Sequence, residues 1–454
     1  MKYIQKTMTT CSVWLMLLFM LASCSNADYV NVIPSNCIAL LSADLSKMQP
    51  INMSQVFSNM LGSSSITDCG LDVKAKLYAF ETIDGNFGLC AHVEDIDKID
   101  AIINQQEGKN GNGHKYVSDD ISFVMLQHWL LAYNSDVFVA LGPIMPTAQA
   151  EAERTLRKMF NQDANMSIVS TPMYARIDTM QTPISLVAQV QSLPEKFAAP
   201  FTLGAPKDAD ASQIMVSASV SIENKCLHIK GTTYSDNEQI NNALKQSWQT
   251  FRSITPTLVS SCDARSLSAL FFNVKGGEFL PLLHQNKSMQ PLLAGINMAI
   301  DMDNILRSVD GDFSLSIPSS SHMFNLSSIQ LTAKLAHSEW LKDIDYWKQS
   351  CPKGTHISTV AANTYCYSSS PSNNFYFGVT PSHHFVCGSS LQQALKGCQP
   401  SSHPLPQNIS TSIVGQRMAL LLNVDALKQS DSTGLVSSLT SALKGVHYIL
   451  YTVK

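Results

Sequence analysis

The sequence predicts an α+β fold built from two similar copies, each an antiparallel sheet with helices packed on one face. Two observations lead to this prediction. Pairs of strand-like runs are repeatedly followed by a single helix-like stretch, which is typical of helices segregated on one face of an antiparallel sheet. The order of these blocks in the first half of the chain also returns in the second half, and such self-similarity indicates a repeated structural unit.

The first block is an apolar strand. Residues 39–45 recur in character as residues 269–275 and again as residues 419–425. Each run is apolar, ends in polar residues and precedes a helix-like stretch. We therefore expect a strand at all three places, with a partial third repeat at the end of the chain.

The second block is a strand followed by a helix. In the first half, a strand at residues 87–93 precedes Asp95 and a helix with isoleucines on one face. In the second half, residues 329–335 alternate as a strand and precede a helix with Trp340, Ile344 and Trp347 on one face. The spacing of these side chains predicts amphipathic helices.

The third block is a hairpin with a helix behind it. Residues 130–141 contain two strands joined by a turn at Asn134, and Pro146 opens a helix. Residues 375–388 repeat this layout, with a turn at residues 381–384. Both turns carry residues that favour tight hairpin connections.

Between the two sets of blocks lies an added hairpin and helix. Residues 214–222 alternate between apolar and polar side chains, turn at Asn224 and return through Cys226. Ser235 and Glu238 then form a candidate capping box for the next helix. We divide the chain into a signal peptide at residues 1–23, a first copy at residues 24–257 that includes this unit, and a second copy at residues 258–454.

The first residues resemble a bacterial lipoprotein signal. Lys2 and Lys6 precede an uncharged apolar run at residues 13–21, and Leu21-Ala22-Ser23-Cys24 is similar to a lipobox. Such a signal is cut before the cysteine, whose thiol is acylated, and two or three acyl chains give stable membrane anchoring. The alternative is a plain secretory signal with a chance cysteine at position 24.

Composition bounds the class of protein. Charged residues make up 15% of the chain and apolar residues 45%, which is typical of folded domains. The net charge of −4 comes without a basic block. A nucleic-acid partner is therefore not expected, because phosphate binding requires clustered Lys and Arg side chains.

The cysteines suggest neither a zinc site nor a redox centre. The chain has 11 cysteines, and removing Cys11 with the signal and Cys24 to lipid leaves nine. They include no Cys-x-x-Cys pair and no histidine at zinc-finger spacing. Cys351 and Cys398 each follow a helix-like segment close to a proline, so they are a candidate disulfide pair in an oxidising compartment.

Motifs for enzymes and cofactors are absent. The sequence has no G-x-S-x-G, H-E-x-x-H, P-loop or G-x-G-x-x-G pattern, so it predicts no catalytic, cofactor-binding or metal-binding residue. Trp340 and Trp347 could line a sugar-binding face, but their helical spacing favours a core role. His383 and His384 are adjacent in a turn, which favours solvated side chains over a metal-binding pair.

Two short motifs suggest covalent modification. Thr179 and Ser432 each follow an aspartate, in a pattern that fits O-glycosylation in some bacteria. The pattern is short enough that chance matches are expected.

The chain resembles a family of uncharacterised envelope lipoproteins from anaerobic Gram-negative gut bacteria, known only as a domain of unknown function. The resemblance rests on the signal with its lipobox, on residues 32–35 before the first strand, on the turn at residues 132–136 and on the return of the same blocks in the second half of the chain. It implies outer-membrane anchoring and a two-copy α+β fold. It carries no catalytic residues.

These observations favour a non-enzymatic lipoprotein that is anchored in the cell envelope and presents an interaction or scaffold surface to another envelope component. A second reading is a glycan- or peptide-binding module, which requires exposed aromatic side chains on one concave face. A third is a hydrolase, which requires a pocket that gathers His, Asp and Ser side chains from separate segments.

Overall fold

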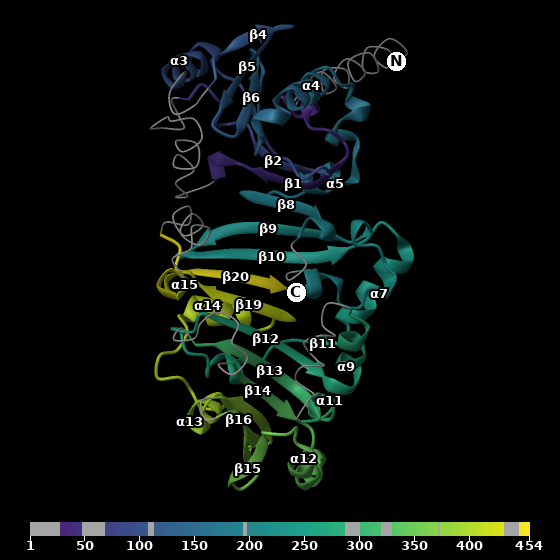
Figure 1. The fold of residues 1–454 in the computed structure, drawn as a ribbon, viewed down its shortest axis with the longest axis vertical. Helices are drawn as coiled ribbons and strands as arrows, with labels where there is room; N and C mark the ends of the chain where they lie inside the picture. Colours follow the sequence, from purple (N-terminus) through teal and green to yellow (C-terminus); the bar gives the residue numbers. More distant parts are fainter. Residues whose placement is uncertain are drawn as a thin grey trace, which may run out of the picture. The chain divides into compact units, whose positions relative to one another are not determined.

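The computed structural model describes residues 28–47, 69–107, 113–193, 198–286, 300–318, 329–370, 373–430 and 445–454. Within these ranges the fold is α+β, as the sequence predicts. The chain divides into two compact units (Figure 1). Unit 1 contains Met1–Ser46 and Ser54–Thr179, and unit 2 contains Lys47–Met53 and Met180–Lys454. The sequence-based boundary after residue 257 falls within unit 2.

Unit 1 is an antiparallel sheet in which the strand order is β1-β2-β3-β7-β6-β5-β4. Its strands are β1 (Cys37–Ala43), β2 (Leu77–Thr82), β3 (Phe87–His92), β4 (Tyr116–Ser118), β5 (Ile121–Leu126), β6 (Trp129–Tyr133) and β7 (Val137–Gly142). The β6–β7 hairpin confirms the predicted turn at Asn134. The side-chain Oδ1 of Asn134 accepts hydrogen bonds from the backbone N–H groups of Asp136 and Val137, at 3.0 and 2.8 Å.

The helices of unit 1 are α3 (Ile96–Gln106), α4 (Gln149–Phe160) and α5 (Pro172–Asp178), with 3-10 turns η1 (Asp28–Val32), η2 (Leu45–Lys47), η4 (Pro146–Ala148), η5 (Ala164–Met166) and η6 (Ile168–Ser170). Two of these helices, α3 and α5, begin after a residue whose side chain caps the first turn. Asp95 caps α3 by accepting hydrogen bonds from the N–H groups of Asp97 and Lys98. Pro146 opens the 3-10 turn η4, which leads directly into α4.

Unit 2 contains a longer sheet, in which the strand order is β8-β9-β10-β20-β19-β12-β13-β14-β18-β17-β16-β15. Neighbouring strands are antiparallel except for the parallel pair β10 and β20. The bounds are β8 (Ile184–Gln189), β9 (Met215–Glu223), β10 (Cys226–Tyr234), β12 (Ser268–Lys275), β13 (Val309–Ile317), β14 (Gln330–Leu335), β15 (His356–Ala361), β16 (Thr364–Ser370), β17 (Asn373–Val379), β18 (His384–Gly388), β19 (Met418–Asn423) and β20 (Tyr448–Val453). The short strand β11 (Phe251–Arg252) pairs with the end of β12.

Two predicted hairpins of unit 2 are confirmed. Strands β9 and β10 pair around Asn224 and Lys225, which both have positive φ, the backbone geometry of a tight two-residue hairpin turn. Strands β17 and β18 pair across the predicted turn at residues 381–384. The expected capping box is wrong in detail, because Asn237 caps the helix that follows and Ser235 instead accepts a hydrogen bond from the N–H of Asn237.

Helices cover both faces of the sheet in unit 2, so the expectation of helices on one face is wrong here. Successive residues of a strand point to opposite faces. Phe272 of β12 packs in a core cluster with residues of α9, α11 and α12, whereas Phe271 packs in another cluster with residues of α8 and α14. The reason is that β12 is apolar on both faces instead of alternating.

The helices of this unit are α7 (Glu238–Trp248), α8 (Pro256–Val259), α9 (Gly276–Gln285), α11 (Met302–Arg307), α12 (Ile344–Ser350), α13 (Leu391–Lys396), α14 (Gln407–Ile413) and α15 (Val424–Ser430), with 3-10 turns η7 (Val190–Ser192), η8 (Ala199–Thr202), η9 (Ala211–Gln213) and η11 (Glu339–Asp343).

Aromatic side chains fill much of the larger core of unit 2. Trp340 and Trp347 stack with ring centroids 5.8 Å apart, and Phe385 meets Trp340 edge-on. Both tryptophans are buried. The core interpretation of this pair is therefore confirmed, and the two rings offer no sugar-binding face.

We expect Trp340→Ala to lower the free energy of unfolding by about 3–5 kcal/mol, because the substitution leaves a large cavity in a packed core. Trp340 is 1% exposed, whereas Tyr346 on the same helical segment is 70% exposed. The control Tyr346→Ala should change the same free energy by no more than about 0.5 kcal/mol. Denaturant unfolding followed by circular dichroism measures both changes, and equal losses would contradict the packing described here.

Candidate functional site

A polar pocket opens on the sheet of unit 2, beside the loop that follows α8. Its volume is about 470 Å³. The lining comes from the loop after α8, from the residue that follows β13, from β14, from α13 and from the segment after α13, and most of its side chains are polar. It consists of Ser261, Asp263, Arg265, Ser266, Pro318, Gln330, Gln393, Lys396, Gln399, Pro400, Ser401 and Ser402.

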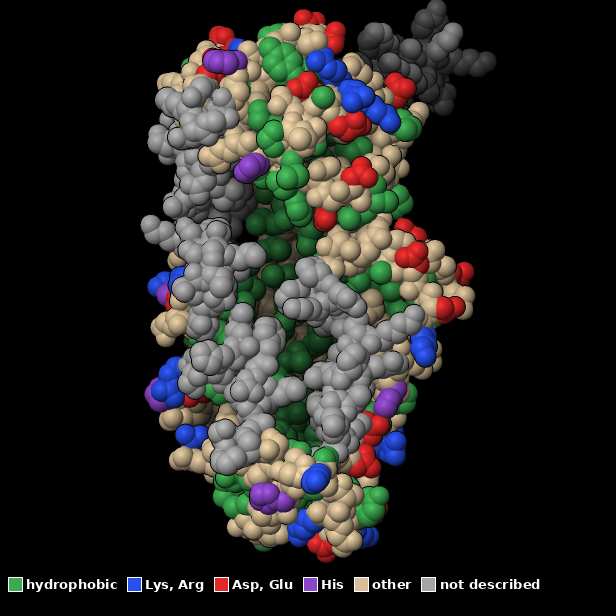
Figure 2. Space-filling model, viewed as in Figure 1, with side chains coloured by type: hydrophobic (Ala, Val, Ile, Leu, Met, Phe, Trp, Pro, Cys, Tyr) green, Lys and Arg blue, Asp and Glu red, His purple; other side chains and the backbone are tan. Residues whose placement is uncertain are grey.

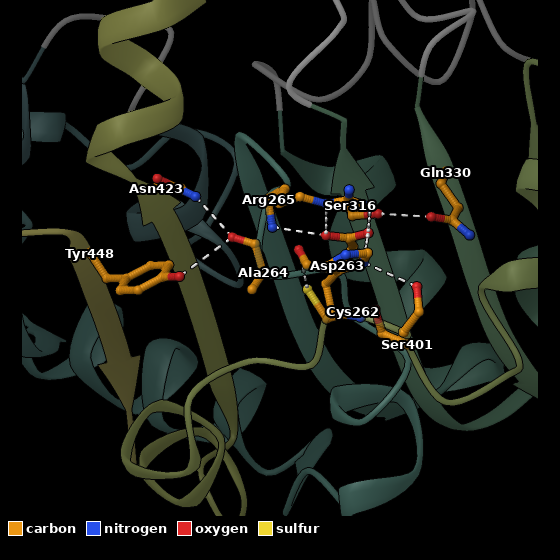
Figure 3. A network of polar contacts seen from close by, with 11 residues as sticks. Cys262, Asp263, Ala264, Arg265, Ser316, Gln330, Ser401, Asn423 and Tyr448 are labelled. Carbon is orange, nitrogen blue, oxygen red and sulfur yellow. Dashed lines mark hydrogen bonds and ion pairs between the residues drawn. The ribbon is translucent and has the colours of Figure 1, made fainter.

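Asp263 fixes the shape of the loop (Figure 3). Its Oδ1 accepts hydrogen bonds from the backbone N–H and from Nε of Arg265, at 2.9 and 3.0 Å, and its Oδ2 accepts one from the Arg265 guanidinium at 2.6 Å. The hydrogen bonds from Arg265 are the main reason that the pKa of Asp263 lies below its ordinary value. Ser266 closes the turn by donating its backbone N–H to the carbonyl of Asp263.

Ala264, which lies between Asp263 and Arg265, ties the loop to the sheet. The carbonyl of Ala264 accepts hydrogen bonds from Nδ2 of Asn423, on β19, at 2.8 Å and from the hydroxyl of Tyr448, on β20, at 3.4 Å. Figure 3 shows both side chains pointing at this carbonyl. The N–H of Ala264 donates to the carbonyl of His403 at 2.8 Å. The pocket wall is therefore held by three separate segments of the chain.

The opposite wall is built from amide side chains. Ser316, on β13, donates its hydroxyl to Oε1 of Gln330, on β14, at 3.2 Å. Gln330 in turn donates Nε2 to the carbonyl of Gln393, on α13, at 2.7 Å. Helix α13 can lie this close because it ends at Gly397, where an added Cβ would stand 2.0 Å from Oγ1 of Thr332.

His403 stands beside the pocket, but its contacts do not form a catalytic relay. Nδ1 of His403 lies 3.0 Å from the hydroxyl of Ser402 and 3.9 Å from Oδ2 of Asp263. In a Ser-His-Asp triad the carboxylate holds Nδ1 while the nucleophile bonds to Nε2. Here the serine and the aspartate face the same ring nitrogen, so these three side chains do not have the geometry of such a triad.

A second feature of unit 2 is an apolar row across the sheet, which we call the apolar stripe. Paired strands place one residue from each strand in register on the same face. The stripe consists of Ile184, Val220, Ile229, Tyr451, Leu420, Leu270, Leu315 and Leu331. Leu420 is exposed and the other members are half-buried. In Figure 2, hydrophobic side chains gather in a hollow over the strands from β9 to β13.

The pocket and the stripe use opposite faces of the same strands. Ser316 and Gln330 line or border the pocket, while their chain neighbours Leu315 and Leu331 belong to the stripe. The sequence did not single out either feature. The alternation at residues 214–222 gave a partial signal for the stripe, since Val220 and Ile222 are the half-buried members of that pattern.

Of the three residues singled out for lipidation or glycosylation, Thr179 lies within the described residues. Cys24 and Ser432 lie outside the described residues. Thr179 is exposed directly after α5, and its hydroxyl donates to the carbonyl of Arg176 at 2.7 Å. Its O-glycosylation stays a prediction.

All nine cysteines in the described ranges are free thiols, Cys351 and Cys398 included. The Cys351 thiol donates to the carbonyl of Trp347. Burial raises the pKa of the Cys398 thiol to about 11. The two are not bonded to each other in this structure, and both are less deeply buried than the other seven.

The described residues contain no group of three or more His, Cys, Asp or Glu side chains placed to hold a metal ion. None of the helices in these ranges is both long enough and apolar enough to span a bilayer.

We expect Arg265→Gln to raise the pKa of Asp263 towards its ordinary value, because the variant loses the cation that favours the carboxylate. A carboxyl group whose pKa is lower in the folded protein than in the unfolded chain stabilises the folded state at pH values above its ordinary pKa. This stabilisation is lost as the pH falls through the pKa of the folded state. The gap in stability between wild type and variant should therefore close as the pH is lowered from about 6 to about 3.

Carbon-13 NMR titration of labelled aspartate, with Asp263→Asn to assign the signal, measures this shift. Arg154→Gln removes an exposed cation that pairs with Glu151 on α4 and should leave the Asp263 titration unchanged. A titration of Asp263 that does not respond to Arg265→Gln would show that another group sets its pKa.

Comparison with known proteins gives a family but no activity. No curated protein matches the chain. Among solved structures, crystal form IV of TP0453 is similar with a TM-score of 0.27 and 10% identity, over 43% of this chain and 76% of that one. Crystal form III of the same protein gives a TM-score of 0.25 and 8% identity, over 81% of this chain and 96% of that one. The model of a domain of unknown function, DUF4836, matches residues 63–397, and the chain belongs to that family.

Proposed function

We propose that this protein is a non-enzymatic lipoprotein of the cell envelope that binds another envelope component. The anchor is the acylated thiol of Cys24, and the cut before this residue frees an amine that can carry a further acyl chain. The sequence Leu21-Ala22-Ser23-Cys24 after a charged and then apolar start supports this assignment. The outer membrane of a Gram-negative anaerobe is the proposed location, on either its periplasmic or its outer face.

The observation that carries the binding role is the apolar stripe. Soluble proteins rarely leave a contiguous apolar surface open unless it meets a partner or a ligand. The stripe crosses eight paired strands, and Leu420 near its middle is 43% exposed. A surface of this kind supports interaction better than catalysis, since it carries no acid, base or nucleophile apart from the phenol of Tyr451.

The polar pocket supports a second candidate role, the binding of a small polar ligand such as a glycan. Its amide and hydroxyl side chains suit polyhydroxylated ligands. Aromatic stacking platforms, however, are not part of its lining. Hydrolysis has weaker support still, because Ser402 and Asp263 face the same nitrogen of His403.

We also propose that the two halves arose by duplication. Three strands of the recurring apolar type, β1, β12 and β19, are each followed along the chain by a helical connection. Each then pairs antiparallel with the next strand, which is β2, β13 or β20. This shared layout supports a common unit used twice, with a partial third use at the end.

The anchor is tested by growing the native host with an alkyne fatty acid and comparing wild type with Cys24→Ala. We expect label in the wild type alone, with the variant released from the membrane fraction, because one thiol carries the acyl chain. Cys351→Ala is the matched control, since it removes another cysteine and should keep both the label and the membrane association. Equal labelling of wild type and Cys24→Ala would refute the lipoprotein assignment.

A further inference from the structure

The charged side chains of the polar pocket leave one positive charge unmatched. The charged members of its lining are two cations, Arg265 and Lys396, and one carboxylate, Asp263. Both oxygens of this carboxylate accept hydrogen bonds from Arg265. Within the described ranges, the ammonium of Lys396 has neither an ion pair nor a hydrogen bond. The pocket therefore holds a cation that no carboxylate of the described residues neutralises.

Arg265 is held in place and still has donors to offer. Its Nε and one terminal nitrogen, Nη2, donate to Asp263 at 3.0 and 2.6 Å. Its other terminal nitrogen, Nη1, has no hydrogen-bond partner in the part of the chain that the structure describes. Because Asp263 already fixes the guanidinium, little side-chain freedom is lost when a ligand binds. A fixed guanidinium with an open edge suits the planar oxygens of a carboxylate.

The backbone at the end of α13 does not compete for these cations. The carbonyls of residues 393–396 each accept a hydrogen bond from within the protein. Gln330 donates Nε2 to the first of them at 2.7 Å, and the N–H groups of residues 397–399 donate to the other three at 3.1 and 3.3 Å. These carbonyls therefore offer little to a cation. The open hydrogen-bonding groups of the pocket are mainly donors, which favours a ligand rich in acceptors.

The rest of the lining is uncharged and mostly polar. It supplies the hydroxyls of four serines and the side-chain amides of three glutamines, with prolines at two positions. Among the described residues, the side chains of Ser266 and Gln399 have no hydrogen-bond partner. The volume of about 470 Å³ lies within the range of about 300–1,000 Å³ that is typical of small-molecule pockets. A bare inorganic anion would leave these hydroxyl and amide groups unused, whereas a hydroxylated molecule can bond to them.

We propose that the polar pocket binds a small sugar acid, whose carboxylate meets Lys396 and Arg265 and whose hydroxyls meet the uncharged lining. The proposal rests on the second candidate role given above and replaces a neutral glycan with an acidic one. It depends on neither the apolar stripe nor the anchor, because the stripe lies on the opposite face of the sheet and Cys24 is a separate group.

The first test is isothermal titration calorimetry of the full chain carrying Cys24→Ala, with D-glucuronate, D-glucose and inorganic phosphate as separate probes. We expect glucuronate to bind at least about tenfold more tightly than either other probe, because it alone combines a carboxylate with hydroxyls. Raising the salt concentration from about 0.05 M to about 0.5 M should weaken this binding, because salt screens the exposed charge of Lys396.

The other outcomes of this titration each count against the proposal. Glucose that binds as tightly as glucuronate would make the pocket a site for neutral glycans. Phosphate that binds as tightly would show that the anion alone is recognised. An absence of glucuronate binding would remove the ligand class altogether.

Lys396→Gln should lower the affinity for glucuronate about tenfold, because the carboxylate loses a charge-assisted contact. Lys396→Arg keeps the cation and should retain most of the binding. The matched control is Lys342→Gln on η11, which removes an exposed lysine that does not line the pocket and should leave the affinity unchanged. Equal losses in the two glutamine variants would show a general charge effect and refute the contact. Thermal melting by circular dichroism confirms that each variant folds.

Hydrogen exchange followed by mass spectrometry then locates the bound probe. With glucuronate present, we expect slower exchange at residues 261–266 and 396–402, and unchanged exchange in β8 and β15. Slower exchange that is confined to other segments would place the ligand elsewhere and overturn the assignment. Fatty-acid labelling at Cys24 decides the anchor separately, so a failure of the sugar-acid proposal is distinguishable from a failure of the lipoprotein assignment.

Discussion

The architecture of unit 2 depends on one strand at the end of the chain. Strand β20 pairs in parallel with β10 on one side and antiparallel with β19 on the other. Without it, both neighbours would present unpaired edges to water. Leu450 of this strand is fully buried in the core cluster with α8 and α14. A pairing between residues more than two hundred positions apart therefore unites β8–β10 with the rest of the sheet.

The same strand contributes to both functional features. The hydroxyl of Tyr448 bonds to the loop that carries Asp263 and Arg265, and Tyr451 forms part of the apolar stripe. Alternation along the strand sends successive side chains to opposite faces. One sheet therefore presents a polar pocket on one face and an apolar hollow on the other, and neither requires a separate domain.

Sequence reasoning located the elements whose signals are local. The hairpin turns at Asn134 and Asn224, the helix that follows Asp95 and the Trp340 helix face are each encoded within a few residues. The strand order was not predictable, because β20 meets β10 through a long-range parallel pairing. The helices on both faces were missed since β12 has adjacent phenylalanines, which periodicity alone cannot assign to one side.

The candidate sites were missed for a related reason. Asp263, Gln330 and Ser401 are far apart in the sequence and belong to no catalytic motif, so only the fold brings them to one pocket. Each stripe residue is an ordinary strand residue. What distinguishes it is that the described helices do not cover it completely, a property of packing rather than of sequence.

The burial of the cysteines has a consequence for how such a chain can mature. Burial raises the pKa of the Cys37, Cys226, Cys262 and Cys387 thiols to about 12, so almost none of the reactive thiolate forms near neutral pH. A chain with an odd number of thiols that folds under oxidising conditions must hide them before they react. If this protein folds under such conditions, its thiols must be packed in the core before an oxidant reaches them. Oxidation before packing would give non-native disulfides instead of the native molecule.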